Sequence, residues 1–422
     1  MLEMRKMKDS GIEWIGEIPE GWEIGQIGQL YSERRTKVSD KDYPPLSVTM
    51  KGILPQLSTA AKTDAHDDRK LVCKGDFAIN SRSDRRGSCG ISEQDGSISL
   101  INTVLQPRGE MDPGYYNWLF HTSMFADEFY KWGHGIVDDL WTTGWSDMKK
   151  IGVPVPSKCE QKQLAEHLNL ECSNIDAILS KTRSSIEEYK KLKQAVITQA
   201  VTKGVRGERE MKDSGVEWIG EIPEEWNKCK LKNISIDIGD GLHGTPKFDD
   251  SGEVYFINGN NFSSEYVEPK FDTKKLCLEE SLNYPKPELT EQTIMISLNG
   301  SYGKVCLYRY FPMLLGKSAG YITLLPSINR RYVRYYLSST PAQIIMTLSL
   351  NGTTIPNLSL NTLYNFPTIL PSASEQAEIA DHLDIKCAEI DKLIAKKEQL
   401  VKELESYKKS LIYEVVTGKR EV

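Results

Sequence analysis

The sequence predicts an α+β protein in which two mixed α/β segments are separated by two long antiparallel helices, which pair as an intramolecular coiled coil around an approximate two-fold axis. One observation behind this prediction is a short motif that occurs twice, and another is a long helical pattern that also occurs twice. The third is that the segments enclosed by these repeats, residues 23–155 and 227–370, show no comparable identity.

The short repeat, called the tryptophan motif below, reads MKDSGIEWIGEIPEGW at residues 7–22 and MKDSGVEWIGEIPEEW at residues 211–226. Only two positions differ between the copies. Chance does not produce such a match, so we infer a duplication or a strongly shared function. Each copy is therefore expected to make the same contact.

The helical repeat covers residues 156–204 and 371–419, which align without gaps at a constant offset of 215 residues. Its two copies share polar, apolar and cysteine positions. The matched positions are Glu160-Gln161 with Glu375-Gln376, His167 with His382, Cys172 with Cys387, Ile175-Asp176 with Ile390-Asp391, and Thr202 with Thr417.

Both copies of the helical repeat begin and end as helices do. Ser157 and Glu160 have the S-x-x-E spacing of a capping box, in which the serine oxygen accepts from the third amide and the glutamate reaches back to the cap amide. The second copy repeats this spacing, and each box follows a proline. Gly204 and Gly418 are natural C-terminal stops.

One apolar stripe runs along each predicted helix, with the three- and four-residue spacing of a single buried face. Its members are Ile175, Leu179, Ile186, Tyr189, Leu192, Val196 and Ala200 in the first copy, and Ile390, Ile394, Val401, Leu404, Tyr407, Leu411 and Val415 in the second. About 40 helical residues span about 60 Å. A helix of this length with one narrow stripe needs a partner, and the other copy supplies it.

Composition bounds the class of protein without deciding the partner. With 39% hydrophobic and 27% charged residues, the chain has the composition of a soluble globular protein. It has no apolar run long enough to cross a bilayer, and its start lacks the apolar core of a signal peptide, so we expect a cytoplasmic protein. The net charge of −6 leaves nucleic acid open as a partner, because acidic helices can coexist with a basic groove.

The cysteines and histidines do not predict a metal site. The eight cysteines form no C-x-x-C pair, so we expect ordinary buried or half-buried thiols. His167 and His382 have no second ligand nearby, which favours packed or partner-facing histidines. Asp176 and Asp391 are interpreted as solvated or docking residues, and the Glu and Lys runs as the wet face of a coiled coil.

The two dissimilar segments combine strand-like and helical sequence. Residues 75–79 and 293–298 are short apolar runs with turn formers at their edges, which is typical of strands. Residues 113–120 and 331–337 are aromatic-rich stretches that we interpret as helices whose aromatic residues belong to the core.

Loops rich in hydrogen-bond donors recur in both segments. They lie at residues 80–88, 240–246, 258–261, 299–304 and 351–354. Asn-Gly and Asp-Gly pairs also form ordinary turns, so no single loop indicates binding. Because such loops recur and carry Arg or Lys, they favour contacts with base edges and phosphates. The candidate DNA-binding residues are Arg82, Ser83, Arg85, Arg86, Ser88, His243, Thr245, Asn258, Asn260, Asn261, Asn299, Ser301, Tyr302, Lys304 and Asn351.

Together these motifs resemble the specificity subunit of type I restriction–modification systems (the HsdS family). The resemblance rests on DSGIEWIGEIPEGW, the P-S-x-x-E-Q helix start and the A-V/V-V-T-x-G helix end. It extends through DGLHGTP, ISLNGSYGKVCLY and NGTTIPNLSLNTLYNFPTILP in the second segment, and so covers essentially the whole chain. The first segment lacks a D-G-x-H-G-T-P loop and carries the arginine-rich loop instead.

The resemblance implies a division into four parts. Residues 1–155 hold a tryptophan motif and a first target-recognition domain, residues 156–206 a first spacer helix, residues 207–370 a second motif and recognition domain, and residues 371–422 a second spacer helix. Each recognition domain would read one half of an asymmetric bipartite site in double-stranded DNA. The helices would set the spacer and dock two methyltransferase subunits, and restriction (translocase) subunits would join through the assembled complex. Each tryptophan motif would contact a methyltransferase copy or the opposite helix pair.

The sequence also lacks the motifs of a self-contained enzyme. It has no N-P-P-Y or D-P-P-Y run and no glycine-rich strand–turn–helix for S-adenosylmethionine, so no cofactor is expected. Leu315-Gly316-Lys317-Ser318 mimics the end of a P-loop, but Phe311 stands where its first glycine belongs. The resemblance places catalysis in partner subunits. A self-contained restriction enzyme is one alternative, for which the duplication leaves no space, and a scaffold without site-specific DNA binding is the other.

Overall fold

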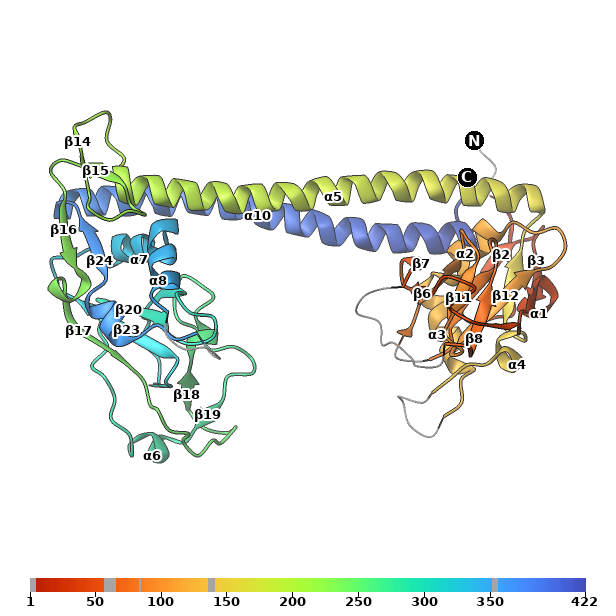
Figure 1. Cartoon of the computed structure of the whole chain (residues 1–422), viewed down its shortest axis with the longest axis horizontal. Coiled ribbons are helices and arrows are strands. Elements are labelled where there is room, and N and C mark those ends of the chain that lie inside the picture. Colours follow the sequence, from red (N-terminus) through yellow and green to blue (C-terminus); the bar gives the residue numbers. More distant parts are fainter. Residues whose placement is uncertain (1–4, 57–65, 83–84, 136–140, 351–355) are drawn as a thin grey trace. The chain divides into compact units, whose positions relative to one another are not determined.

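The computed structural model describes residues 5–56, 66–82, 85–135, 141–350 and 356–422 (Figure 1). The chain forms two compact units. Unit 1 comprises residues 1–183 and 399–422, and unit 2 comprises residues 184–398. Each unit therefore contains one of the dissimilar segments together with a stretch of both long helices. The units are described separately below.

Unit 1 contains short strands and helices that precede the first long helix in the chain. In chain order these are β1 (Met7–Asp9), β2 (Glu17–Pro19), β3 (Glu23–Gln26), α1 (Ile27–Leu30), β4 (Tyr31–Glu33), β5 (Lys37–Val38), β6 (Leu46–Thr49), β7 (Gly52–Pro55), β8 (Arg69–Val72), β9 (Phe77–Asn80), β10 (Cys89–Ile91), β11 (Gly96–Ile98), β12 (Asn102–Pro107), α2 (Pro113–Phe120), α3 (Ser123–Lys131), α4 (Trp145–Met148) and β13 (Gly152–Val155).

Unit 2 contains a comparable series. In chain order these are β14 (Met211–Asp213), β15 (Glu221–Pro223), β16 (Asn227–Lys230), the 3₁₀ helix η3 (Leu231–Asn233), β17 (Ser235–Asp240), β18 (Val254–Ile257), η4 (Gly259–Asn261), β19 (Lys275–Leu276), α6 (Leu278–Ser281), β20 (Thr293–Ser297), β21 (Val305–Leu307), β22 (Met313–Leu315), β23 (Ala319–Leu324), α7 (Arg330–Ser338), α8 (Thr340–Leu348), α9 (Leu360–Tyr364) and β24 (Pro367–Leu370).

The two predicted long helices are present as α5 (Lys158–Lys203) and α10 (Ala373–Val416). The serine half of each predicted capping box forms, because the amide of Glu160 donates to Ser157 Oγ at 3.3 Å and that of Glu375 to Ser372 Oγ at 3.3 Å. Gly204 and Gly418 follow the helices at φ +78° and +71°, a conformation that favours glycine.

The helices run antiparallel within each unit, and repeat-related ion pairs join them. In unit 1 Lys408 Nζ lies 2.6 Å from Asp176 Oδ1, and in unit 2 Lys193 Nζ lies 2.6 Å from Asp391 Oδ2. The interpretation of Asp176 and Asp391 as solvated or docking residues was therefore incomplete. Although partly exposed, each aspartate pairs with a lysine of the other helix. In each unit, one residue of the ion pair belongs to the first copy of the helical repeat and the other to the second copy.

Of the fourteen residues of the predicted apolar stripe, seven are buried and five are half-buried, whereas Leu192 and Tyr407 are 48% and 44% exposed. These two residues occupy matched positions of the helical repeat, so the stripe is interrupted at the same place in both helices. Ile197 and Val201, which the stripe did not include, are buried. They face the core of unit 2, because the C-terminal part of α5 contacts a globular segment as well as α10.

Both dissimilar segments contain a four-stranded antiparallel sheet with the same order of strands. The order is β10-β9-β12-β4 in unit 1 and β21-β20-β23-β17 in unit 2. In each sheet the second and third strands are buried over most of their length. The duplication therefore extends into segments whose sequences have diverged, and the smaller three-stranded sheets, β11-β8-β5 and β19-β18-β22, are where they differ most.

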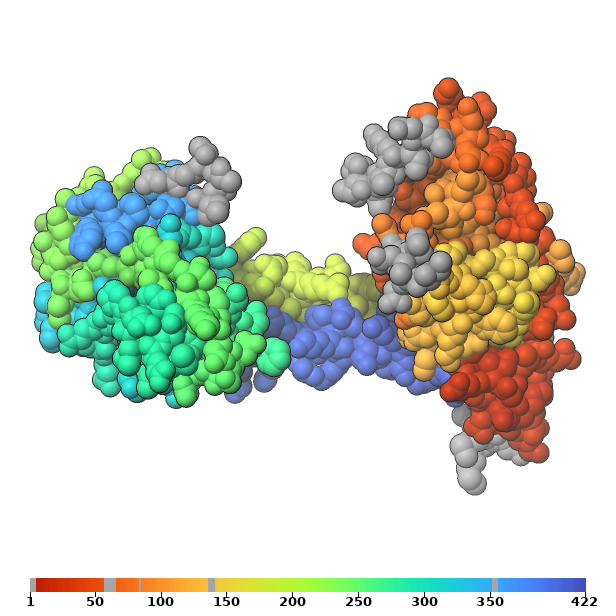
Figure 2. All heavy atoms as spheres, turned by 90° about the horizontal axis from the view of Figure 1, so that it is seen from below, coloured from red at the N-terminus to blue at the C-terminus, as the bar shows by residue number. Residues whose placement is uncertain are grey.

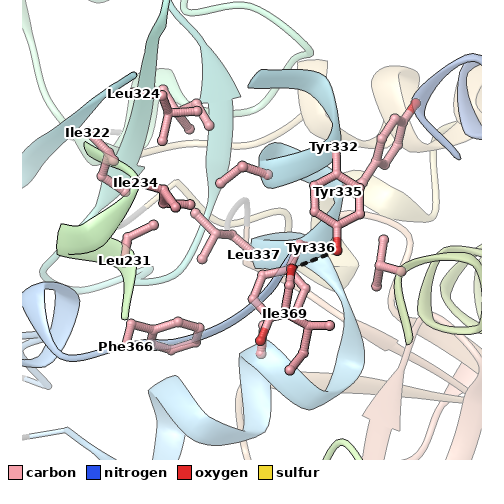
Figure 3. Packing of buried hydrophobic residues seen from close by; sticks show 14 of the residues in the cluster. Leu231, Ile234, Ile322, Leu324, Tyr332, Tyr335, Tyr336, Leu337, Phe366 and Ile369 are labelled. Atoms are coloured by element: carbon pink, nitrogen blue, oxygen red, sulfur yellow. Dashed lines mark hydrogen bonds between the residues drawn. The ribbon is translucent and has the colours of Figure 1, made fainter. Parts of the chain in front are cut away.

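An aromatic helix connects each sheet to the start of a long helix. The side-chain oxygen of Gln161 in α5 accepts from the amide of Asp112 at 2.8 Å, and that of Gln376 in α10 accepts from the amide of Asn329 at 2.9 Å. Figure 3 shows Tyr332, Tyr335 and Tyr336 of α7 in the core of unit 2, where the Tyr332 hydroxyl donates to the carbonyl of Ile369 at 2.8 Å. The prediction that these aromatic residues belong to the core is confirmed.

The tryptophan motifs cover the C-terminal ends of the long helices. In unit 1 Ile15, Ile18 and Trp22 pack with Val415 and Val416 of α10. In unit 2 the matching side chains pack with Ala200 and Val201 of α5. A contact with the long helices, one of the two contacts that the sequence left open, is therefore present in both units.

A glutamate at the start of each long helix joins the tryptophan motif, and it is buried in unit 2 and half-buried in unit 1. Glu375 Oε1 lies 2.6 Å from Arg209 Nη2, and its Oε2 accepts from the Trp226 indole N–H at 3.0 Å. In unit 1 Glu160 pairs with Arg5, whose guanidinium lies 5.4 Å from the Trp22 ring centroid. The expected capping bond from these glutamates is thus replaced by ion pairs, because an arginine just ahead of each motif is a stronger partner than the cap amide.

Candidate nucleic-acid interface

The loops predicted to bind DNA follow the same strand in both sheets. The loop after β9 contains the arginine cluster, and the loop after β20 contains Asn299–Lys304. Each forms an isolated antiparallel bridge with a segment further along the chain, Arg82 with Thr142 in unit 1 and Asn299 with Asn357 in unit 2.

Two further backbone hydrogen bonds hold each loop in the same way. In unit 1 the amide of Ser81 donates to Ile101 at 3.2 Å, and its carbonyl accepts from Thr143 at 2.9 Å. In unit 2 Leu298 makes the matching bonds, to Ser318 at 3.0 Å and from Leu358 at 2.8 Å. The dissimilar loops are therefore presented by one backbone frame, called the loop frame below.

The arginines of unit 1 lie on the surface of this frame. Arg82, Arg85 and Arg86 are exposed, whereas Ser88 is only 5% exposed and lies beneath the loop, where its backbone pairs with that of Asn80. Ser88 is thus a structural residue in this conformation, and its assignment as a DNA contact is not supported by its position. Ser83 lies outside the described residues.

Arg86 is fixed by its own domain. Its guanidinium lies 2.9 Å from Asp127 Oδ1 and 3.8 Å from the centroid of the Tyr130 ring. Both partners belong to α3, and Trp141 donates its indole N–H to the carbonyl of Tyr130 at 2.9 Å. The ion pair partly neutralises Arg86, so within the cluster Arg82 is the stronger candidate for a contact with DNA.

The second segment brings three predicted loops together around the turn between β22 and β23. The amide of Leu242 donates to Leu315 at 2.7 Å, the amide of Gly259 donates to Ser318 Oγ at 3.0 Å, and Leu298 contacts Ser318 through its backbone. Figure 2 shows atoms coloured green to teal, which the bar assigns to the stretch between residues 200 and 300, over much of the face of unit 2 that this view presents. The predicted donors of residues 242–304 are therefore parts of one site.

Within this site the predicted residues divide into exposed and structural ones. His243, Thr245, Asn260, Ser301 and Lys304 are exposed, and His243 Nε2 lies 2.7 Å from Asp240 Oδ2.

Asn258, Asn299 and Tyr302 are half-buried. The Asn258 Oδ1 accepts from the Ser318 hydroxyl at 3.0 Å, and the Tyr302 hydroxyl donates to Thr347 Oγ1 at 3.3 Å. Each retains an exposed part for a ligand.

Asn261 is a correction to the predicted site. It is only 3% exposed, and its side chain accepts from the amide of Asn258 at 3.0 Å and donates to Thr273 Oγ1 at 2.8 Å. Such a residue shapes the loop and does not face a ligand. Asn351, the last predicted residue, lies outside the described residues.

Lys317 is a candidate DNA-binding residue that the sequence did not predict. It is exposed and sits on the turn where the three loops of unit 2 meet. The sequence showed it only as the end of an incomplete P-loop motif, because nothing in the sequence places residues 315–318 beside the loops at residues 240–246, 258–261 and 299–304. At the matching turn of unit 1 stand Leu100 and Ile101, 37% and 39% exposed, so the two frames present different chemistry.

The histidines and cysteines of the described residues do not gather into a group of metal ligands. Among the described residues, no group of three or more His, Cys, Asp or Glu side chains could hold a metal ion. His382 is exposed and His167 half-buried. Burial raises the pKa of the Cys306 thiol to about 12, whereas Cys159 is exposed, contrary to the expectation that every thiol is at least half-buried. None of the helices in the described ranges is long and apolar enough to cross a membrane.

Comparison with known proteins identifies relatives along nearly the whole chain. Residues 223–405 match the family model for the type I restriction modification DNA specificity domain. The chain is 26% identical over 425 residues to the type I restriction enzyme MjaVIII specificity subunit of Methanocaldococcus jannaschii, covering 95% of this chain and 93% of that protein. It is 25% identical over 430 residues to the putative MjaX specificity subunit of the same organism, covering 96% and 95%.

Solved structures share the fold. One, from a study of complex assembly and conformational transition of the type I restriction–modification system, aligns with a TM-score of 0.73 at 13% identity, covering 94% of this chain and 98% of that chain. The crystal structure of the HsdS subunit from Thermoanaerobacter tengcongensis aligns with a TM-score of 0.54 at 15% identity, covering 96% and 98%. These likenesses confirm the predicted fold class.

Proposed function

Because the chain is similar over nearly its whole length to type I restriction–modification specificity subunits, we propose that it belongs to this family and that each loop frame reads one half of an asymmetric, bipartite site in double-stranded DNA. The observation that carries this proposal is the repeated loop frame with different side chains on it. Arg82 stands where Asn299 stands in the other frame, and Leu100 where Lys317 stands. Recognition loops that present different donors, acceptors and apolar groups select different bases.

The long helices set the distance between the half-sites in this proposal. Repeat-related ion pairs and buried stripes fix the two helices against each other within each unit. The same helices dock two methyltransferase subunits, and restriction subunits join through the complex. Methylation and cleavage belong to these partners, and this chain contributes recognition without catalysis. The first domain comprises residues 1–155 and the second residues 207–370.

A scaffold that has lost site-specific DNA binding is the competing function. The purified chain with its methyltransferase subunit should shift a DNA duplex that carries the methylated sequence of its host genome. The same complex should shift a much smaller fraction of a duplex in which one half-site is scrambled. Equal shifts for both duplexes would favour the scaffold.

Replacing Arg82 by alanine should weaken DNA binding and reduce the slope of log affinity against log salt by about 1, because one phosphate contact is lost. If Arg82 contacts a base edge, the salt slope stays unchanged, and the preference for one base at one position of the DNA site becomes weaker instead. Arg86→Ala, which also breaks the ion pair with Asp127, should change the slope less. The measurement is a binding isotherm at several salt concentrations. An Arg82→Ala isotherm identical to wild type, with an unchanged sequence preference, would remove Arg82 from the site.

Inserting seven residues into α5 and seven at the matched place in α10 should lengthen the unread spacer of the recognition site or abolish activity. Seven residues keep the apolar stripe nearly in phase, since two helical turns take 7.2 residues. The readout is the methylated sequence in cells carrying the variant. An active variant with an unchanged spacer would show that the helices do not set it.

A further inference from the structure

A groove connects the reading loops of unit 2 to α5. One cavity of about 570 Å³ is lined by Lys304, by residues of α8 and by Gln194 of α5. A second, of about 790 Å³, continues along α5. The two cavities share Gln194 and Thr340 in their linings and are therefore neighbours; together we call them the α5 groove.

Hydrogen bonds hold the walls of the α5 groove together. The side chain of Gln343 donates to the carbonyl of Gly303 at 2.8 Å, which fixes the loop of Lys304 to α8. The amide of Thr340 donates to Thr198 Oγ1 at 3.2 Å, which fixes the start of α8 to α5. The groove is therefore a preformed surface that runs from the loop frame to the helix.

The charges along the α5 groove are mostly positive. The residues that line the two cavities include four lysines, Lys190, Lys191, Lys203 and Lys304, and a single acidic residue, Glu187. Glu187 pairs with Lys190 at 2.9 Å, which leaves an excess of positive charge in a chain whose formal net charge is −6. Most of the remaining lining residues carry hydroxyl or amide groups, which donate hydrogen bonds to phosphate oxygens.

The positive end of a helix dipole also lines the groove. Helix α8 begins at Thr340, and the side chain of its N-cap residue Ser339 donates to Tyr336 instead of capping the helix. The amide of Thr340 already donates to Thr198 Oγ1 and Pro341 has no N–H, so this helix start contributes its dipole to the groove and not a set of free amides.

We propose that the α5 groove holds the phosphodiester backbone of the DNA strand that leaves the reading loops of unit 2. This inference rests on the proposed function. It adds a contact with the DNA backbone, made by a helix that would otherwise only set the distance between the half-sites. Phosphates would pass Lys304 first, then the hydroxyl and amide groups near Thr340, and then Lys190 and Lys191.

The repeat distinguishes DNA from a partner protein as the occupant. A protein that docks once on each copy of a repeated frame needs the same residues in both copies. At the positions of α10 that match Lys190 and Lys191 stand Glu405 and Ser406. Other positions of α10 that match the groove lining carry Lys402 and Lys409, but Glu405 and Glu414 balance these lysines. The excess of positive charge is thus found in one copy, as is expected for a strand that follows an asymmetric site.

The test uses the full chain assembled with its methyltransferase subunit, and a duplex that carries the site mapped from methylated host DNA. Lys190→Ala with Lys191→Ala should reduce the slope of log affinity against log salt by about 2, since each lost lysine contact removes about 0.9. The methylated sequence should stay the same, because phosphate contacts do not select bases. A control variant replaces Lys392 and Lys396, which are exposed in the same unit but lie outside the groove lining, and should keep the wild-type slope.

Two results would overturn the groove proposal while leaving the proposed function intact. One is wild-type slope and affinity in the Lys190/Lys191 double variant. The other is loss of a bound methyltransferase copy with an unchanged salt slope, measured by the mass of the complex, which would make the groove a protein-docking surface. Failure of the wild-type complex to prefer its site over scrambled DNA would instead refute the proposed function.

Discussion

Replacing Glu375 by alanine is expected to destabilise unit 2 by about 3 kcal/mol, because it leaves a mostly buried arginine and an indole N–H without their acceptor. Glu375 is 1% exposed and contacts both Arg209 and Trp226. Arg209 would keep the partly exposed Glu225, at 2.7 Å, and the carbonyl of Lys203, at 3.0 Å. Hydrogen exchange of peptides from unit 2, together with thermal unfolding of the full chain, measures the loss.

The repeat supplies a matched control for this prediction. Glu160 occupies the same place in unit 1, but its side chain is 25% exposed, and among the described residues the Trp22 indole N–H has no hydrogen-bond partner. Glu160→Ala should therefore cost about 1 kcal/mol or less, since partly exposed ion pairs contribute little. Equal losses for the two variants would mean that burial of Glu375 does not strengthen its contacts.

Exchanging residues 23–155 for the corresponding segment of another specificity subunit should change one half of the methylated sequence completely and leave the other half intact. The expectation follows from the loop frames, because the arginine cluster and the Leu100–Ile101 turn are held within unit 1 by bonds to residues of the same segment. The measurement is the sequence context of methylated adenine in cells that express the chimaera.

A reciprocal exchange of residues 227–370 is the control, and it should alter only the other half-site. If either exchange changed both halves, base selection would depend on residues outside the exchanged segment, and the two frames would not be independent readers. If neither exchange changed the motif, the variable segments would not be the readers.

The repeated parts of the fold were predictable from sequence, because their signals are local. The serine caps, the glycine stops and most of the stripe appear where the sequence places them. Partners that lie far apart in the chain were not predictable. The S-x-x-E spacing indicated a glutamate bonded to its own helix start, yet Glu375 binds an arginine 166 residues away. Asp176 pairs with a lysine 232 residues away.

The candidate site was predictable as a set of loops but not as a surface. Donor-rich composition identified the loops that adjoin in unit 2, yet it could not distinguish Asn260, which is exposed, from Asn261, which holds the loop from inside. Lys317 carried no signal, since its place beside the loops comes from strand pairing between β22, β23 and their neighbours. Burial and long-range pairing, which depend on the whole fold, decided these positions.

Single-molecule sequencing of methylated adenines in the host genome tests most directly whether two dissimilar frames read two different half-sites. It should find one asymmetric motif with two specified parts of different sequence, separated by a spacer of constant length, and the motif should disappear when this chain is deleted. A palindromic or uninterrupted motif dependent on this chain, or no motif at all, would contradict that assignment.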